Sequence, residues 1–199
     1  MTDVYLEVGA RWTFACAIDW PGWCRRGKGE EAAIEELVAY ATRYTEAIGQ
    51  PVDARDLRVI GRVPGDKTTD FGAPHIIGPT DDGPLAPDEA HRITGLVVAC
   101  WDAFDRGVAT APATLRKGPR GGGRDRDQIA DHVREAERAY ASKAGVRIPP
   151  RTPWPDQRRM LAEVLRAGAP DGSWPMRYAA RRIAWHVLDH LWEIEDKST

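Results

Sequence analysis

The stretch RIAWHVLDHLWEIED, residues 182–196, decides how the second half of this chain folds. It is apolar around most of a helical circumference and carries two histidines four residues apart. At 3.6 residues per turn, His186 and His190 lie about 40° apart and share a side with Ile183 and Val187. A helix with so wide an apolar surface is usually central in its fold. The stretch therefore predicts a buried helix that directs both imidazoles inward.

Three segments upstream share this helical periodicity and are separated by Gly- and Pro-rich stretches. Together with the last segment, they cover approximately residues 88–110, 126–144, 155–167 and 175–196. Four helices with apolar stripes predict an all-α, up-down four-helix bundle over residues 87–199. His132 lies beside Ile129 and Ala136 on the apolar side of the second segment, so we expect a third imidazole in the interior.

The first 65 residues have a pattern typical of a small α+β domain. Alternating apolar residues within 3–18 predict a hairpin, a helix follows from about 30 to 48, and DLRVIGRV (56–63) predicts another strand. We therefore expect an α+β unit of order ββαβ over residues 1–65. Residues 66–86 are rich in Pro, Gly, Asp and Thr, a composition that predicts a linker or a long surface connection.

Charge and composition exclude several classes of partner. The 199 residues carry a net charge of −2 and are 42% hydrophobic, so we expect no nucleic-acid partner. No apolar run approaches the roughly 18 residues that a membrane span needs, and no signal peptide is evident, so we expect a cytoplasmic protein. Three cysteines (Cys16, Cys24 and Cys100) without a CxxC motif indicate reduced thiols rather than a disulfide scaffold.

Three inward-facing histidines on two helices suggest a metal site. Neutral imidazole is a good ligand for Zn, Ni and Fe. Three protein ligands with one position left open are the usual arrangement of a catalytic metal. The alternative is that each histidine is a core residue with one satisfied hydrogen bond.

A resemblance to a known family suggests which reaction this site would catalyse. On HVREAE (132–137) and HVLDH (186–190), residues 87–199 resemble the DinB superfamily of four-helix proteins, which includes bacillithiol transferases and mycothiol-dependent maleylpyruvate isomerases. The resemblance implies a divalent metal bound by His132, His186 and His190. It also implies a low-molecular-weight thiol that the metal activates for S-transfer or isomerisation.

Two carboxylates are candidates for a role beside the metal. Sulfoxide synthases of ergothioneine-type pathways carry a related bundle with a Glu downstream of the histidine pair, and Glu193 follows His190 at a slightly different spacing. Glu193 is thus a candidate catalytic residue, which would orient a ligand or act as a base. The alternative is a solvated side chain on the last helical turn. In a hydrolytic or oxygen-dependent reaction, Glu193 or Glu135 would serve as the base.

The loop LRKGPRGGGRDR, residues 115–126, leads into the helix that carries His132. Guanidinium groups and the amides of a Gly-rich loop bind phosphate or carboxylate groups. We therefore expect Arg116, Arg120 and Arg124 to bind an anionic small-molecule substrate. The alternative is a solvated connection between two helices.

The N-terminal unit resembles a second family. FACAIDWPGWCRRGKGEEAAIEEL (14–37) resembles the HicB-like antitoxin fold, in which a strand ends in a Pro-Gly turn before a helix with an acidic start. The resemblance covers roughly residues 3–63. HicB-like proteins often bind a toxin and carry a DNA-binding segment, but no helix-turn-helix or basic ribbon is evident here. We therefore expect a likeness of fold alone.

Three hypotheses follow for the whole chain. The first is a metal-dependent enzyme that acts through a thiol, and the second is a non-catalytic metal-binding or protein-interaction module. The third is a metal-dependent hydrolase or oxygen-using enzyme. Under the first, the expected partners are an anionic small molecule and a second copy of the chain in a homodimer.

Overall fold

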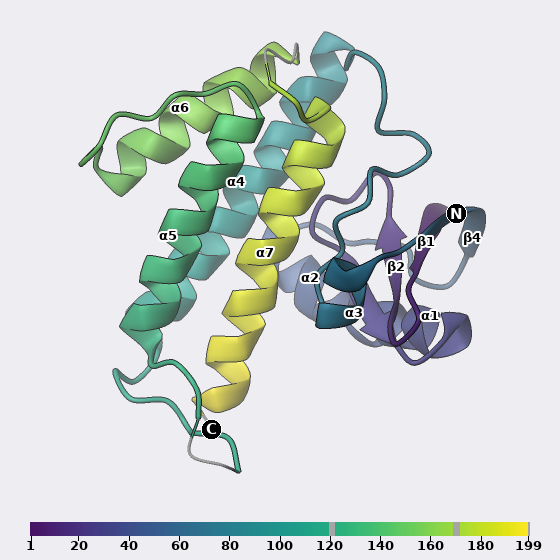
Figure 1. Cartoon of the computed structure of the whole chain (residues 1–199), viewed down its shortest axis with the longest axis horizontal. Coiled ribbons are helices and arrows are strands. Elements are labelled where there is room, and N and C mark those ends of the chain that lie inside the picture. Colours follow the sequence, from purple (N-terminus) through teal and green to yellow (C-terminus); the bar gives the residue numbers. More distant parts are fainter. Residues whose placement is uncertain (120–121, 169–171, 199) are drawn as a thin grey trace.

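The computed structural model describes residues 1–119, 122–168 and 172–198. It is an α+β protein with a small four-stranded sheet near the N-terminus and long helices in the C-terminal half (Figure 1). Among the described residues, no helix is long and apolar enough to span a membrane.

The sheet has the strand order β3-β2-β1-β4. The strands are β1 (Thr2–Val8), β2 (Thr13–Ala17), β3 (Cys24–Gly27) and β4 (Leu57–Pro64). β1 pairs antiparallel with β2, as the hairpin prediction requires, and parallel with β4. The short β3 is absent from the predicted order ββαβ, because its sequence Cys-Arg-Arg-Gly lacks the alternation of a strand.

The predicted helix from about 30 to 48 is two helices, α1 (Glu30–Ala39) and α2 (Ala41–Ile48). The backbone departs from helical geometry at Tyr40, whose φ and ψ are −88° and 0°. The Tyr40 ring lies 4.8 Å from the ring of Trp192, and the guanidinium of Arg25 lies 3.8 Å from the Tyr40 ring centroid. The helix thus breaks at a residue that contacts Arg25 and Trp192. Both partners lie outside residues 30–48, so the helical pattern of this segment could not indicate the break.

Residues 66–86, here called the strap, are anchored on the sheet and differ from a free linker. The strap contains α3 (Lys67–Phe71), which begins with a capping box at Asp66. Glu7 on β1 is fully buried and accepts hydrogen bonds from Thr69 Oγ1 (2.6 Å) and from the backbone amides of His75 (3.0 Å) and Ile76 (3.1 Å). A buried carboxylate needs such donors, so this contact fixes the strap against the central strand.

The other end of the strap is joined to the last helix. Asp81 forms a buried ion pair with Arg181, whose Nε donates to Asp81 Oδ1 at 3.0 Å. Nη1 of Arg181 also donates to the hydroxyl of Tyr5 on β1 at 2.6 Å, and the Tyr178 hydroxyl donates to the carbonyl of His75. The strap therefore joins the sheet to α7 through buried polar groups.

The C-terminal half contains α4 (Pro87–Thr110), α5 (Arg126–Lys143), α6 (Trp154–Ala167) and α7 (Met176–Lys197). These bounds lie within two residues of the predicted segments. α7 packs against α4 and α5, and α4 packs against α6. In Figure 1, α7 (yellow) lies between α5 and the N-terminal unit, and α6 crosses the others at an angle.

α7 is buried on more than one side, as its sequence predicts. Its Trp185 ring makes an edge contact with Phe14 on β2, with ring centroids 6.2 Å apart. Apolar residues elsewhere around the helix, such as Ile183 and Leu191, belong to the main core that α4 and α5 share. α7 thus packs against the sheet on one side and against α4 and α5 on another.

A buried charge holds α5 and α6 together. Glu137 on α5 accepts hydrogen bonds from Arg158 Nε (3.2 Å) and Trp154 Nε1 (2.6 Å), both on α6. Burial raises the pKa of Glu137 even though the Arg158 guanidinium acts in the opposite direction. The pair fixes α5, and with it the position of His132.

Candidate metal centre

The three predicted histidines come together between α5 and α7. His132 lies on α5, and His186 and His190 lie one turn apart on α7. One ring nitrogen from each lies within 4.8 Å of the others, and the Nε2 atoms of His132 and His186 are 3.3 Å apart. The ring centroids are separated by 4.6 to 5.1 Å. The apolar patterns of two helices, 54 residues apart in the sequence, therefore predict side chains that meet in one cluster.

Burial keeps two of these histidines, His132 and His186, in the neutral form that binds metal. His186 is only 7% exposed, and burial lowers its pKa well below the usual value. Burial also lowers the pKa of His132, followed by the positive charge of Arg124. A lowered pKa means that the imidazole stays neutral near pH 7, with one nitrogen lone pair free for a ligand bond.

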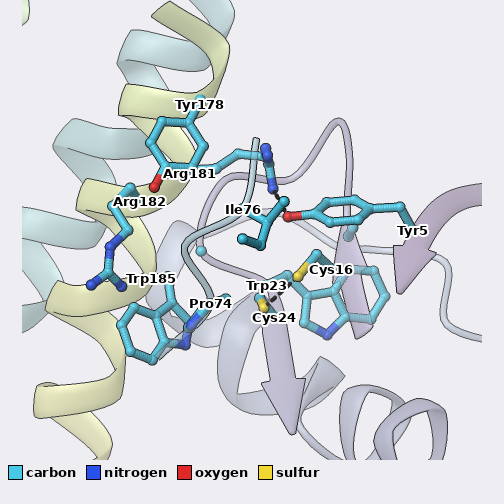
Figure 2. A pocket seen from close by; sticks show the side chains of 12 residues that line it. Tyr5, Cys16, Trp23, Cys24, Pro74, Ile76, Tyr178, Arg181, Arg182 and Trp185 are labelled. Carbon is cyan, nitrogen blue, oxygen red and sulfur yellow. Dashed lines mark hydrogen bonds between the residues drawn. The ribbon is translucent and has the colours of Figure 1, made fainter. Parts of the chain in front are cut away.

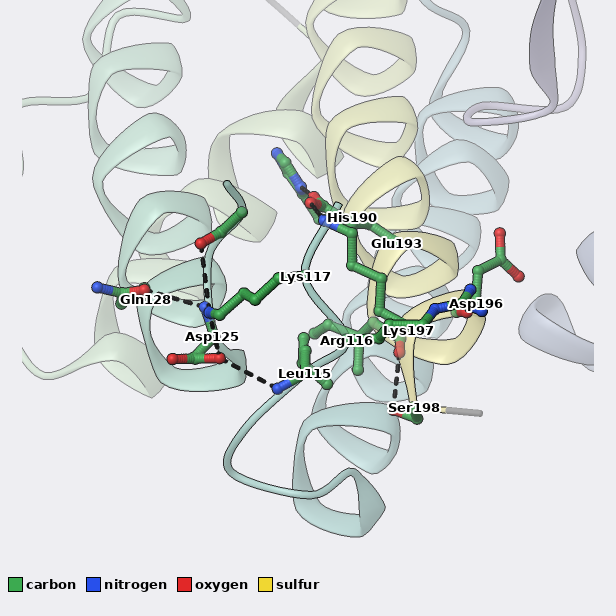
Figure 3. A network of polar contacts seen from close by, with 12 residues as sticks. Leu115, Arg116, Lys117, Asp125, Gln128, His190, Glu193, Asp196, Lys197 and Ser198 are labelled. Carbon is green, nitrogen blue, oxygen red and sulfur yellow. Dashed lines mark hydrogen bonds and ion pairs between the residues drawn. The ribbon is translucent and has the colours of Figure 1, made fainter. Parts of the chain in front are cut away.

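Glu193 lies next to His190 and fixes its orientation (Figure 3). Its Oε2 is 2.7 Å from His190 Nδ1, and its Oε1 accepts from Lys197 Nζ at 2.5 Å. The hydrogen bond with His190 lowers the pKa of Glu193 to about 2. The ionised carboxylate accepts a hydrogen bond from the Nδ1–H of His190, and the tautomer with the proton on Nδ1 leaves the Nε2 lone pair free.

The contacts of Glu193 distinguish between the two roles expected for it, a base and a residue that orients a ligand. A carboxyl group with a pKa of about 2 is a poor proton acceptor at neutral pH. A carboxylate on the outer nitrogen of a histidine is a common support for metal ligands. The geometry therefore favours Glu193 as an orienting residue. Glu135, the other candidate base, is exposed on α5.

The donor set fits a divalent metal ion. Two nitrogens bound to one tetrahedral zinc at about 2.05 Å lie about 3.3 Å apart, the distance between the Nε2 atoms of His132 and His186. The same distance also suits an N–H···N hydrogen bond between the two imidazoles, with the proton on one of them. Metal analysis of the purified protein distinguishes these two states.

His186 has a different environment from His190. Its Nδ1 is buried and has no hydrogen-bond partner among the described residues. Aromatic rings hold the imidazole instead, with Tyr140 at 5.6 Å and Trp185 at 6.2 Å between centroids. Packing thus orients His186, whereas a carboxylate orients His190.

Two of the three arginines predicted to bind substrate are described, and their surroundings differ. Arg116 is exposed and hydrogen-bonds to the end of α7, where its Nη2 donates to the carbonyl of Asp196 at 2.9 Å. Arg120 lies outside the described residues. Arg124 is exposed, and its charge contributes to the lowered pKa of both His132 and His186. Of the two that are described, Arg124 is the one whose charge is among the causes of the lowered histidine pKa values.

Arg182 is a further cation near the histidines, and it is not among the predicted site residues. It lies one turn before His186 on α7, and its guanidinium carbon is 5.4 Å from the Tyr140 ring centroid and 4.7 Å from that of Trp185. Its Nη1 is buried without a hydrogen-bond partner among the described residues. The spacing of four residues from His186 is the sequence signal that points to it.

Comparisons with known proteins add no family to this geometry. No protein-family model, curated protein or solved structure matches the chain. The DinB-like and HicB-like resemblances therefore stay predictions that rest on the motifs quoted above.

Proposed function

We propose that this chain is a metal-dependent enzyme of the DinB-like type that uses a low-molecular-weight thiol for S-transfer or isomerisation. In this proposal α4, α5, α6 and α7 constitute an up-down four-helix bundle, and residues 1–65 are a HicB-like unit that supports it. The observation that carries the proposal is the convergence of three imidazole nitrogens within 4.8 Å, from two helices.

The residues around the histidines have separate tasks in this proposal. His132, His186 and His190 hold a divalent Zn, Ni or Fe ion, which when bound lowers the pKa of a thiol in its open position. Glu193 keeps His190 in the required tautomer. Arg182 and Arg124 attract an anionic substrate, because each places positive charge near His186.

Metal analysis of protein purified without a histidine tag tests the proposal. We expect about one zinc, nickel or iron per chain in the wild type and in His91→Ala, which changes an exposed histidine at the start of α4. We expect His186→Ala to lose the metal, because only two of the three ligand nitrogens would remain. A wild-type protein without stoichiometric metal after supplementation would refute the metal centre.

A second measurement separates an enzyme from a binding module. The metal-loaded protein is incubated with mycothiol, bacillithiol or glutathione and a panel of anionic electrophiles, and thiol consumption is followed. Consumption in the wild type and its loss in His186→Ala support the enzyme. Full metal occupancy without turnover or thiol affinity would leave the non-catalytic module as the better description.

A further inference from the structure

The two cysteines of the sheet face each other across neighbouring strands. Cys16 on β2 is the direct partner of Cys24 on β3, and their sulfur atoms are 2.7 Å apart. In the next position the Ala17 amide donates to the Trp23 carbonyl at 3.0 Å. Ala17 and Trp23 are therefore a hydrogen-bonded pair. Hydrogen-bonded and non-hydrogen-bonded pairs alternate along an antiparallel ladder, so the neighbouring pair, Cys16 and Cys24, is non-hydrogen-bonded. At such positions opposed side chains approach most closely.

Both sulfurs are enclosed but border a cavity between the sheet and α7 (Figure 2). Cys16 is 1% exposed and Cys24 is 6% exposed, and the structure holds them as unpaired thiols. The cavity volume is about 20 Å³, enough for one small molecule the size of water. Tyr5, Arg181 and Trp185 are among the other residues that line it.

We propose that Cys16 and Cys24 are a modification site, at which hydrogen peroxide converts the two thiols into a reversible intrachain disulfide. Opposed Cα atoms at a non-hydrogen-bonded position lie about 4.5 Å apart, within the range of about 4.4 to 6.8 Å that disulfides span. The bond therefore forms with a small movement of two side chains. Peroxide is the oxidant because it is among the smallest uncharged two-electron oxidants, and a cavity of this size favours a small oxidant.

The reaction balances with one peroxide and two thiols. One cysteine loses its proton, and its sulfur attacks a peroxide oxygen. The O–O bond breaks, the leaving hydroxide takes up a proton to become water, and the sulfur becomes a sulfenic acid. The second thiol then attacks this sulfur, the S–O bond breaks, and a second water leaves with the remaining proton. Two thiols are oxidised to one disulfide, and one peroxide is reduced to two waters.

The environment sets the rate of this reaction and its selectivity. Burial raises the pKa of the Cys24 thiol well above its usual value, so thiolate is scarce and oxidation is slow compared with that of exposed, acidic cysteines. Cys100 on α4 is also buried, with a pKa that burial raises. In the described part of the chain Cys100 contacts no second sulfur, so it serves as an internal control.

Peptide mapping tests the proposal on the full chain. The protein is reduced, freed of reductant, treated with peroxide and alkylated after denaturation without reductant. Trypsin then places Cys16 and Cys24 in one peptide, residues 12–25, and Cys100 in another, residues 93–106. We expect peptide 12–25 to lose two hydrogens and to carry no alkyl group. Peptide 93–106 should be alkylated, and dithiothreitol should restore alkylation of both cysteines in 12–25.

Variants assign the bond to these two sulfurs. Cys24→Ala should abolish the mass loss, and Cys100→Ala should leave it unchanged. Two results would overturn the proposal in the wild type itself: full alkylation of peptide 12–25 at peroxide doses that oxidise Cys100, or conversion of its cysteines to sulfinic acid without a disulfide. The test does not involve the metal, so its outcome is independent of the proposed function.

Discussion

His186 should make the stability of the metal-free protein depend on pH between 7 and 5. In the unfolded chain its imidazole takes up a proton at the usual pKa of 6.5, whereas burial lowers the pKa well below that value in the folded chain. Below pH 6.5 the unfolded state therefore binds more protons than the folded state. The contribution of His186 is complete above pH 6.5, and stability is lost as the pH falls below it.

The size of this loss follows from the burial of the side chain. Because His186 is 7% exposed, solvent screens it little, and each pH unit between the two pKa values costs about 1.4 kcal/mol. Lowering the pH from 7 to 5 should therefore cost at most about 2 kcal/mol of unfolding free energy through His186. His132 acts in the same direction, but it is only half-buried and contributes less.

Urea unfolding followed by circular dichroism, in the presence of a chelator, measures this effect. For each protein, the free energy of unfolding at pH 5 is subtracted from that at pH 7. We expect this loss to be larger in the wild type than in His186→Gln. His91→Gln, at an exposed position, should behave like the wild type. Equal losses in the wild type and His186→Gln would show that His186 titrates as a solvated residue, and the picture of a buried neutral ligand would be wrong.

Three substitutions test the other contacts around α7. Asp81→Ala leaves the buried Arg181 guanidinium without its carboxylate, so we expect a loss of about 3–5 kcal/mol in urea unfolding. Glu193→Ala removes the acceptor of His190 Nδ1, and competition with a chromophoric chelator should show metal affinity about 10- to 100-fold weaker. Arg182→Met keeps the apolar stem of the side chain, and steady-state kinetics should show a higher KM for an anionic substrate at unchanged metal content.

Each of these expectations has a control and a contrary result. Arg58→Ala removes an exposed ion pair and should change stability little, so an equal effect of Asp81→Ala would contradict a buried strap. Unchanged metal affinity in Glu193→Ala would remove its orienting role. Arg177→Met is the matched control on α7, because Arg177 already pairs with Glu89. If it raises KM as much as Arg182→Met, the effect is one of net charge.

The helical half was readable from the sequence because periodicity alone determines which side chains share a face. His186 and His190 are close in the sequence, and His132 needed only the apolar side of its own helix. The cysteine pair was not readable, because β3 has no recognisable pattern and its register depends on the Pro-Gly turn before it.

The strap and the arginines depend on contacts between distant residues. The hydrogen bond between Thr69 and Glu7 spans 62 positions, and the ion pair between Arg181 and Asp81 spans 100. Composition indicated a linker because Pro, Gly and Asp occur equally in anchored and free loops. Similarly, Arg116 resembles a substrate-binding residue until the carbonyl of Asp196 is found beside it.

The burial of α7 on more than one side limits how this protein can be divided. The helix that carries His186 and His190 also provides Trp185 to the sheet and Arg181 to the strap. A fragment that begins at Pro87 would expose an indole ring and leave a guanidinium without its counter-ion. The sheet and the helices are therefore expected to evolve together. Recombination could transfer neither part to another chain unless that chain provided a new partner for this face of α7.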